Sequence, residues 1–170
     1  MLEYKEIMNL ERFLMYDLFL YNWQVRDDWF RWCEDLTHDE LTKHRIGGMG
    51  SILKTLFHVI HCEQLWINQM LGDPVIEIDF DATCTLDEVK EFSRTTREIT
   101  KEFFMDWTDQ KDAEILEINS KNGRIFTFPY RKVLNHIISH EIHHIGQLSI
   151  WARELDKKPV NCDLLIREFY

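Results

Sequence analysis

Apolar residues recur at three- and four-residue steps through most of the chain, a pattern that predicts helices with buried faces. The first run predicts a long helix over about residues 3–36. A polar, glycine-rich connection over 37–50 follows, and Ser51 can cap a second helix that reaches residue 71. Beyond the Gly-Asp-Pro sequence that ends this helix, residues 75–84 are expected to be extended or irregular.

The second half of the chain carries its own start and turn signals. Thr85 and Glu88 form a capping-box pattern, which predicts a third helix over 86–106. Residues 114–118 and 124–128 alternate around an Asn-Ser-Lys-Asn-Gly segment, so we expect a short β-hairpin there.

A last long helix is expected to begin at Pro129, because proline suits the first turn of a helix. It should reach about residue 155, and Pro159 limits its continuation. Helices of this length and number predict an all-α fold, a four-helix bundle with a short β-hairpin before the last helix. The length predicts a single domain over residues 1–170.

The composition narrows the classes of partner. The formal net charge of -10 disfavours nucleic acid, because phosphate binding needs a basic face. No apolar run approaches the ~20 residues of a membrane helix, and the start lacks the pattern of a signal peptide. We therefore expect a cytoplasmic protein with reduced cysteines. The four cysteines are Cys33, Cys62, Cys84 and Cys162, and their spacing contains no C-x-x-C motif.

The segment HIISHEIHH, residues 136–144, holds the most informative side chains. His140 and His144 are four residues apart, so both lie on one helix face and can reach one metal ion. The helical period places them on the buried face of the last helix, and places His136 and His143 on its flank or surface. A hydrogen-bonded pair of core histidines is the alternative, and the spacing alone leaves both interpretations open.

The second helix offers a third candidate, His58, among small and apolar neighbours. Cofactor sites of helix bundles are built from side chains on facing helices, so His58 can meet the pair on the last helix. His61 is predicted to point away from that side. Taken alone, His58 fits a buried core histidine equally well.

At these residues the sequence resembles the DinB family. The stretch over 50–67 resembles the family's second-helix pattern, and the stretch over 136–148 resembles its fourth-helix pattern, in which two histidines precede a Gly-Gln pair. A Tyr-Asn pair and a tryptophan resemble its first helix. The matching residues are Tyr21, Asn22, Trp23, His58, Glu63, Trp66, His140, His144, Gly146 and Gln147.

The resemblance implies a three-histidine site of His58, His140 and His144 for one divalent metal ion, with zinc or nickel favoured. It also implies a metal-dependent thiol S-transferase, in which a low-molecular-weight thiol is activated and transferred to an electrophile. Glu63 is expected to accept a hydrogen bond from a ligand imidazole, or else to form a salt bridge. Ile145 stands where relatives often carry a basic residue, which weakens any charge contact to a substrate there.

Two other functions stay open. One is a non-catalytic metal-binding module for stress or damage response. The other is a zinc hydrolase, since residues 140–144 read H-E-x-x-H with Glu141 as the general base. A homodimer is also predicted, because the second helix is apolar on two sides and Ile138, Ile142 and Ile145 lie off the main stripe of the last helix.

Overall fold

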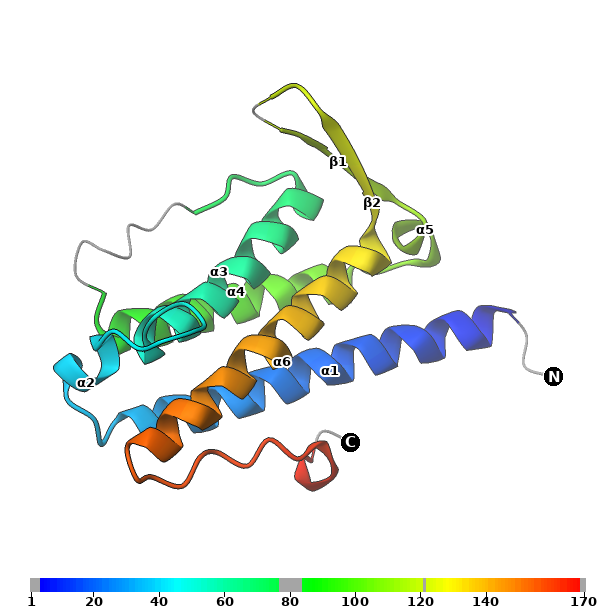
Figure 1. Cartoon of the computed structure of the whole chain (residues 1–170). Coiled ribbons are helices and arrows are strands. Elements are labelled where there is room, and N and C mark those ends of the chain that lie inside the picture. The colour runs from blue at the N-terminus through cyan, green and yellow to red at the C-terminus, as the bar shows by residue number, and fades with distance from the viewer. Residues whose placement is uncertain (1–3, 77–83, 121, 169–170) are drawn as a thin grey trace.

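A computed structural model describes residues 4–76, 84–120 and 122–168 as a helical bundle with one small hairpin beside it (Figure 1). Within these residues the bundle consists of the long helices α1 Tyr4–Cys33, α3 Ile52–Leu71, α4 Leu86–Met105 and α6 Tyr130–Glu154. The predicted all-α bundle with a hairpin before the last helix is therefore confirmed. Within the same residues, no helix is both long and apolar enough to cross a membrane.

The predicted helix starts are visible as hydrogen bonds. The Ser51 side chain accepts from the backbone N–H of Lys54, and Gly72 ends α3 in the left-handed region with φ 77°. At α4 the capping box is complete, because Glu88 N–H donates to Thr85 Oγ1 and Thr85 N–H donates to Glu88 Oε2.

The first helix is shorter than predicted. It ends at Cys33 rather than near residue 36, and a five-residue helix, α2 His38–Thr42, occupies part of the expected connection. Thr37 explains that helix, since its side chain accepts from Glu40 N–H and the first turn is acidic. The predicted irregular segment over 75–84 lies mostly in residues 77–83, outside the described part of the chain.

The hairpin pairs β1 Ile115–Asn119 with β2 Ile125–Pro129 in antiparallel register, one residue later in each strand than predicted. A four-residue helix, α5 Asp109–Asp112, precedes it. The hairpin stands away from the bundle at the start of α6, where buried Leu116 joins the core (Figure 1). The hairpin thus places β2 beside the first turns of α6.

The core has two apolar clusters separated by a polar layer. One cluster centres on Trp29, Leu56 and Leu148, and the other on Phe19, Ile67, Phe103 and Ile137. Between them along the bundle, each long helix contributes a buried polar side chain. These side chains are Arg26 on α1, Glu63 on α3, Ser93 on α4 and Glu141 on α6.

The structure corrects the premise of the dimer prediction. Helix α3 packs on both α4 and α6 within the chain, so its second apolar side is covered. Ile138 and Ile145 are each only 4% exposed and belong to the core, because the buried face of α6 is rotated from the predicted stripe. Of the three isoleucines, Ile142 stays exposed. The dimer itself stays a prediction.

After α6 the chain turns back and lies along α1 (Figure 1). The hydroxyl of Tyr21 donates to the carbonyl of Cys162 at 2.7 Å, and the indole N–H of Trp32 donates to the carbonyl of Lys158 at 3.0 Å. Arg167 forms an ion pair with Asp28 at 2.5 Å. This C-terminal segment therefore covers the outer side of α1, away from α3.

Candidate metal centre

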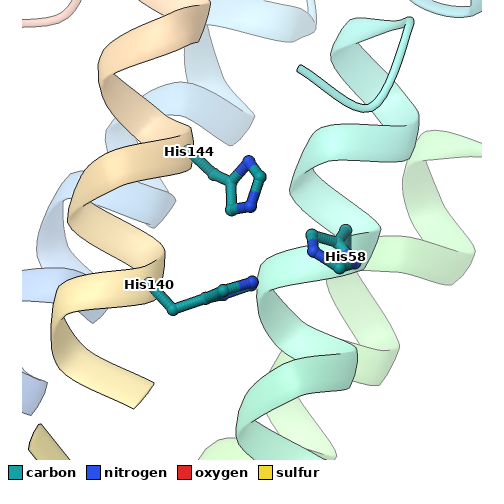
Figure 2. A group of neighbouring side chains, drawn as sticks. All are labelled: His58, His140 and His144. Atoms are coloured by element: carbon teal, nitrogen blue, oxygen red, sulfur yellow. The ribbon is translucent and has the colours of Figure 1, made fainter. Parts of the chain in front are cut away.

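Three histidines from two helices converge between α3 and α6. His58 comes from α3, and His140 and His144 come from successive turns of α6 (Figure 2). The ring centroids lie 4.7 Å apart for His58 and His140, 4.8 Å for His58 and His144, and 4.5 Å for His140 and His144. The predicted third candidate thus lies beside the predicted pair.

The donor set fits a divalent metal ion. One ring nitrogen from each histidine lies within 4.8 Å of the other two. A tetrahedral ion bound at ~2.0–2.1 Å holds its nitrogen ligands about 3.4 Å apart, so a small rotation of the rings closes the site. His140 also has a buried Nδ1 atom without a hydrogen-bond partner among the described residues. Such an orphaned nitrogen is unfavourable unless something binds it.

The three histidines are half-buried, which differs from the predicted position on the core-facing stripe. The buried face of α6 includes Ile137, Glu141, Ile145 and Leu148, and the histidines lie at its edge. The prediction placed His144 too near the centre because periodicity alone could not show how far α6 is rotated against α1. An edge position leaves the site open to solvent, as a catalytic metal site requires.

The environment favours neutral imidazoles. Burial, and after it the neighbouring histidines with His144 first, together lower the pKa of His140 to about 4. Burial is also the main cause of the lowered pKa of His58, followed by His144 and His61. Metal ligation needs the unprotonated ring, so at neutral pH neither of these residues has a proton to lose before binding.

Gln147 holds one of the three rings in place. Its Oε1 atom lies 3.1 Å from His144 Nδ1, and its Nε2 atom lies 3.2 Å from His143 Nε2. The loop before α3 fixes the glutamine, because a Cβ atom on Gly48 would lie only 2.6 Å from Gln147 Oε1. A partner of this kind on the second ring nitrogen orients a metal-binding histidine.

The remaining histidines of the two helices lie outside the cluster. His136 and His143 are exposed, as predicted, although the His136 ring lies 5.5 Å from that of His140. His61 is not part of the cluster and instead stacks on Phe57 with the ring planes 15° apart. The predicted division between inward and outward histidines therefore agrees with the structure.

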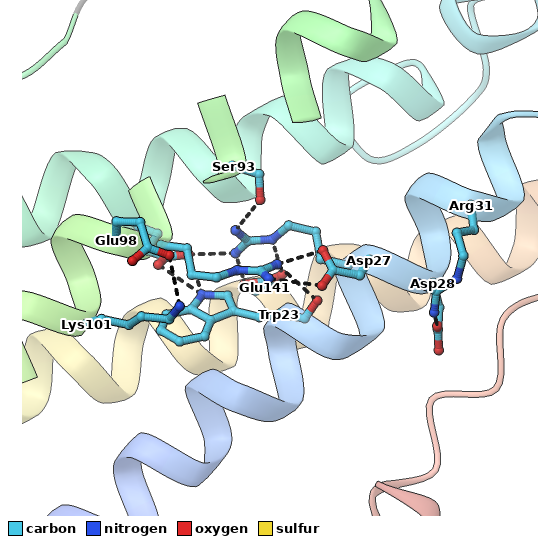
Figure 3. Close-up of polar contacts among 11 residues, drawn as sticks. Trp23, Asp27, Asp28, Arg31, Ser93, Glu98, Lys101 and Glu141 are labelled. Atoms are coloured by element: carbon cyan, nitrogen blue, oxygen red, sulfur yellow. Dashed lines mark hydrogen bonds and ion pairs between the residues drawn. The ribbon is translucent and has the colours of Figure 1, made fainter. Parts of the chain in front are cut away.

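A buried ion cluster joins the two ligand-bearing helices to α1. Arg26 donates from Nη2 to Glu63 Oε2 at 2.6 Å and to Glu141 Oε2 at 2.5 Å, and from Nε to Glu141 Oε1 at 2.8 Å. Ser93 accepts from its Nη1 atom at 3.1 Å. Figure 3 draws these contacts around the labelled Ser93 and Glu141. Arg26 is fully buried. Its hydrogen bonds connect α1, α3, α4 and α6 in one layer.

This cluster corrects the expectation for Glu63. Its carboxylate accepts from Trp23 Nε1 at 3.1 Å and from Thr100 Oγ1 at 2.8 Å, besides Arg26, and accepts no hydrogen bond from a histidine among the described residues. The salt-bridge alternative is the correct one. The hydrogen bond expected from Glu63 is made instead by Gln147, whose position three residues after His144 was the available signal.

Charges in this layer compensate one another. Burial acts to lower the pKa of Arg26, but the charges of Glu141 and Glu63 outweigh it, so that pKa is raised. Burial raises the pKa of Glu141, and Arg26 opposes the change. Both carboxylate oxygens of Glu141 accept hydrogen bonds from Arg26. The sequence offered one signal for Arg26, a single arginine within the apolar stripe of the first helix.

The fold and the convergent histidines define a helix-bundle protein with a candidate metal centre between two helices. The sequence profile of the DinB family matches residues 8–170. The chain therefore belongs to the DinB family. It is also 44% identical over 153 residues to a Bacillus subtilis (strain 168) protein described as uncharacterized protein YizA, a match that covers 90% of this chain and 95% of that one.

Proposed function

We propose that His58, His140 and His144 bind one divalent metal ion, zinc or nickel, and that this centre activates a low-molecular-weight thiol for S-transfer to an electrophile. The observation that carries the proposal is the convergence of three half-buried histidines without a carboxylate among them. Three neutral ligands leave a coordination position open and the charge of the ion uncompensated. An ion in such a site supplies Lewis acidity that lowers the pKa of a bound thiol.

The chain's own cysteines are poor sources of a thiolate. Cys62 lies one turn after His58, but burial raises its pKa to about 12. Burial likewise raises the pKa of Cys33 to about 12 and raises those of Cys84 and Cys162. The reactive form of a cysteine is its thiolate, so a thiol from outside the protein is the better nucleophile.

A basin of about 900 Å³ with polar and apolar walls lies near Gln147 and offers room for such a thiol. Its walls include Gly48, which packs against Gln147, and Lys54, one turn before His58 on α3. In the proposed reaction the thiol gives its proton to solvent and its sulfur forms a bond to an electrophilic carbon. The leaving group departs with the electrons of the bond that breaks.

Metal analysis of protein purified without a histidine tag tests the first half of the proposal. We expect about one divalent ion per chain, and a strong reduction in His58→Ala, His140→Ala and His144→Ala. The matched controls His136→Ala and His143→Ala should keep the ion. Full metal content in the three ligand variants would refute the site.

Conjugation assays test the second half. The rate of conjugation to a chromogenic electrophile is measured for metal-loaded protein and for its His144→Ala variant. Each protein is given a panel of thiols, such as cysteine, glutathione and coenzyme A. A metal-dependent rate in the unaltered protein supports S-transfer. Equal background rates for both proteins with every thiol would favour the non-catalytic metal-binding module.

The position of Glu141 argues against the zinc hydrolase. The general base of an H-E-x-x-H site must reach the reacting water beside the metal. Glu141 is 2% exposed, and Arg26 occupies both of its carboxylate oxygens. We therefore expect no cleavage of casein or generic peptides by the metal-loaded protein, and peptide hydrolysis that disappears in Glu141→Gln would restore this alternative.

A further inference from the structure

An apolar cavity of about 270 Å³ lies between α3, β2 and α6, toward the His140 end of the candidate centre. It is lined by Trp66, Phe128, Lys132, Val133 and His136, which come from α3, β2 and α6. We call it the Trp66 pocket. The hairpin contributes to its wall, because Phe128 lies on β2, where it pairs with Leu116 of β1.

The Trp66 pocket adjoins the histidine cluster. The His136 ring that lines it lies 5.5 Å from the ring of His140. On the opposite wall Trp66 follows His58 by eight residues of α3, a distance of about 12 Å along a helix. A molecule in the pocket would therefore lie next to the position where a metal ion would be held.

The walls select a flat apolar group. The Trp66 ring lies 6.3 Å from that of Phe128 at 89° and 5.8 Å from that of His136 at 85°. These distances are those of rings in edge-to-face contact, so the three rings form one aromatic wall, and a further aromatic ring can pack against that wall. The volume is at the small end for ligand sites, which suits one small molecule.

The walls of this pocket are almost wholly apolar, and Lys132 is the charged side chain among the described lining residues. Lys132 is exposed and makes no ion pair among the described residues, and none of the described lining residues is acidic. The rest of the protein is strongly acidic, with a net charge of -10. A cationic ligand would have no counter-charge in these walls, whereas a carboxylate can pair with Lys132.

We propose that the Trp66 pocket binds a small aromatic carboxylate, with the ring against Trp66 and Phe128 and the carboxylate at Lys132. Resting on the proposed function, we infer that this ligand is the electrophilic co-substrate, held beside the centre while the thiol occupies the basin at its other end. The pocket thereby assigns the substrate class that the three histidines leave open.

Binding of 2-naphthoate to metal-free protein tests the pocket without any catalysis. Calorimetry should show one saturable site, and 2-naphthalenemethanol provides an uncharged ligand of matched shape. Lys132→Gln should lower the affinity for naphthoate about two- to fivefold, as expected for an exposed ion pair, and leave the affinity for the alcohol unchanged. Trp66→Ala should weaken both ligands by about tenfold or more.

Lys158→Gln is the matched control, since this lysine is also exposed but lies beyond the far end of α6. It should bind both ligands like the unaltered protein. Circular dichroism confirms that each variant is folded. Absence of naphthoate binding, or an equal loss of naphthoate affinity in Lys132→Gln and Lys158→Gln, would refute the proposal that the Trp66 pocket binds an aromatic carboxylate.

A second measurement separates this inference from the proposed function. Protein loaded with Co²⁺ should relax the proton resonances of bound naphthoate much faster than protein loaded with Zn²⁺. If naphthoate binds metal-free protein but the three histidines take up no metal, the proposed function fails and the pocket stands. If Co²⁺ binds without relaxing the bound naphthoate, the pocket is not next to the centre and its role as co-substrate site is refuted.

Discussion

Gln147 Oε1 lies 3.1 Å from His144 Nδ1, one turn along α6. A carbonyl oxygen can only accept, so this contact assigns the proton of the imidazole to Nδ1. The lone pair is then on Nε2, the nitrogen left free to bind a metal ion. The glutamine thus selects both the tautomer and the ring orientation.

Replacement of this glutamine should weaken metal binding without unfolding the protein. We expect Gln147→Leu to lose about 10- to 100-fold in affinity for Zn²⁺, measured by competition with a chelator, because His144 loses its orienting partner. Asn135→Leu, an exposed amide on the same helix, is the control and should bind normally. An unchanged affinity in Gln147→Leu would show that the contact has no influence on the ring.

Loss of Arg26 should destabilise the whole bundle. In Arg26→Met the carboxylates of Glu63 and Glu141 lose their buried counter-charge, which costs about 3–5 kcal/mol of unfolding free energy. Urea denaturation measures this loss. Arg97→Met is the matched control, because Arg97 pairs with the partly exposed Asp27, and it should cost about 1 kcal/mol or less.

The origin of that loss can be tested by removing the two negative charges as well. A triple variant that adds Glu63→Gln and Glu141→Gln to Arg26→Met should recover part of the lost stability, since no uncompensated charge is left in the core. If the triple variant is less stable than Arg26→Met alone, the cost comes from lost packing rather than from the buried charges.

The histidines predict a pH dependence of the metal-free protein. The pKa of His140 falls from 6.5 to about 4 on folding, so between these values the unfolded chain binds a proton that the folded chain does not. Stability is therefore lost as the pH falls through this window, and His58 contributes in the same direction. As the pH is lowered from 6.5 to 4, the urea midpoint should decrease less in His140→Gln than in the unaltered protein. Parallel pH profiles would contradict the lowered pKa.

We retain the homodimer as a prediction with a revised surface. Ile142 and Ile150 are 45% and 61% exposed and lie two turns apart on the outer face of α6, with Gly146 between them. Light scattering at micromolar concentration should give a dimer mass, and Ile142→Ser with Ile150→Ser should give a monomer. Leu165→Ser, which changes an exposed side chain elsewhere, should leave the mass unchanged.

Local signals predicted the local structure well. Ser51, Thr85 and Glu88 marked helix starts that the structure confirms, because a cap depends on a few neighbouring backbone groups. The division of the histidines also followed from spacing, since the helical period relates neighbours on one helix. The contribution of His58 came from its neighbours and from the resemblance, because no periodicity relates two separate helices.

Contacts between distant segments could not be predicted in this way. The pairing of Arg26 with Glu63 and Glu141 depends on the rotation of three helices against one another, which also moved His144 from the stripe to its edge. The Trp66 pocket depends on the position of Phe128, which is set by the packing of the hairpin against the bundle. Both arise from packing of the folded chain and leave little trace in any single segment.

The half-buried position of the histidines has a consequence for handling the protein. None of the three histidines belongs to either core cluster, and all three are partly exposed to solvent. An ion held there would exchange with chelators and with immobilised nickel while the bundle stays folded. The ion found after purification would then reflect the resin and the buffers, and only rapid isolation from cells under defined metal supply would report the physiological one.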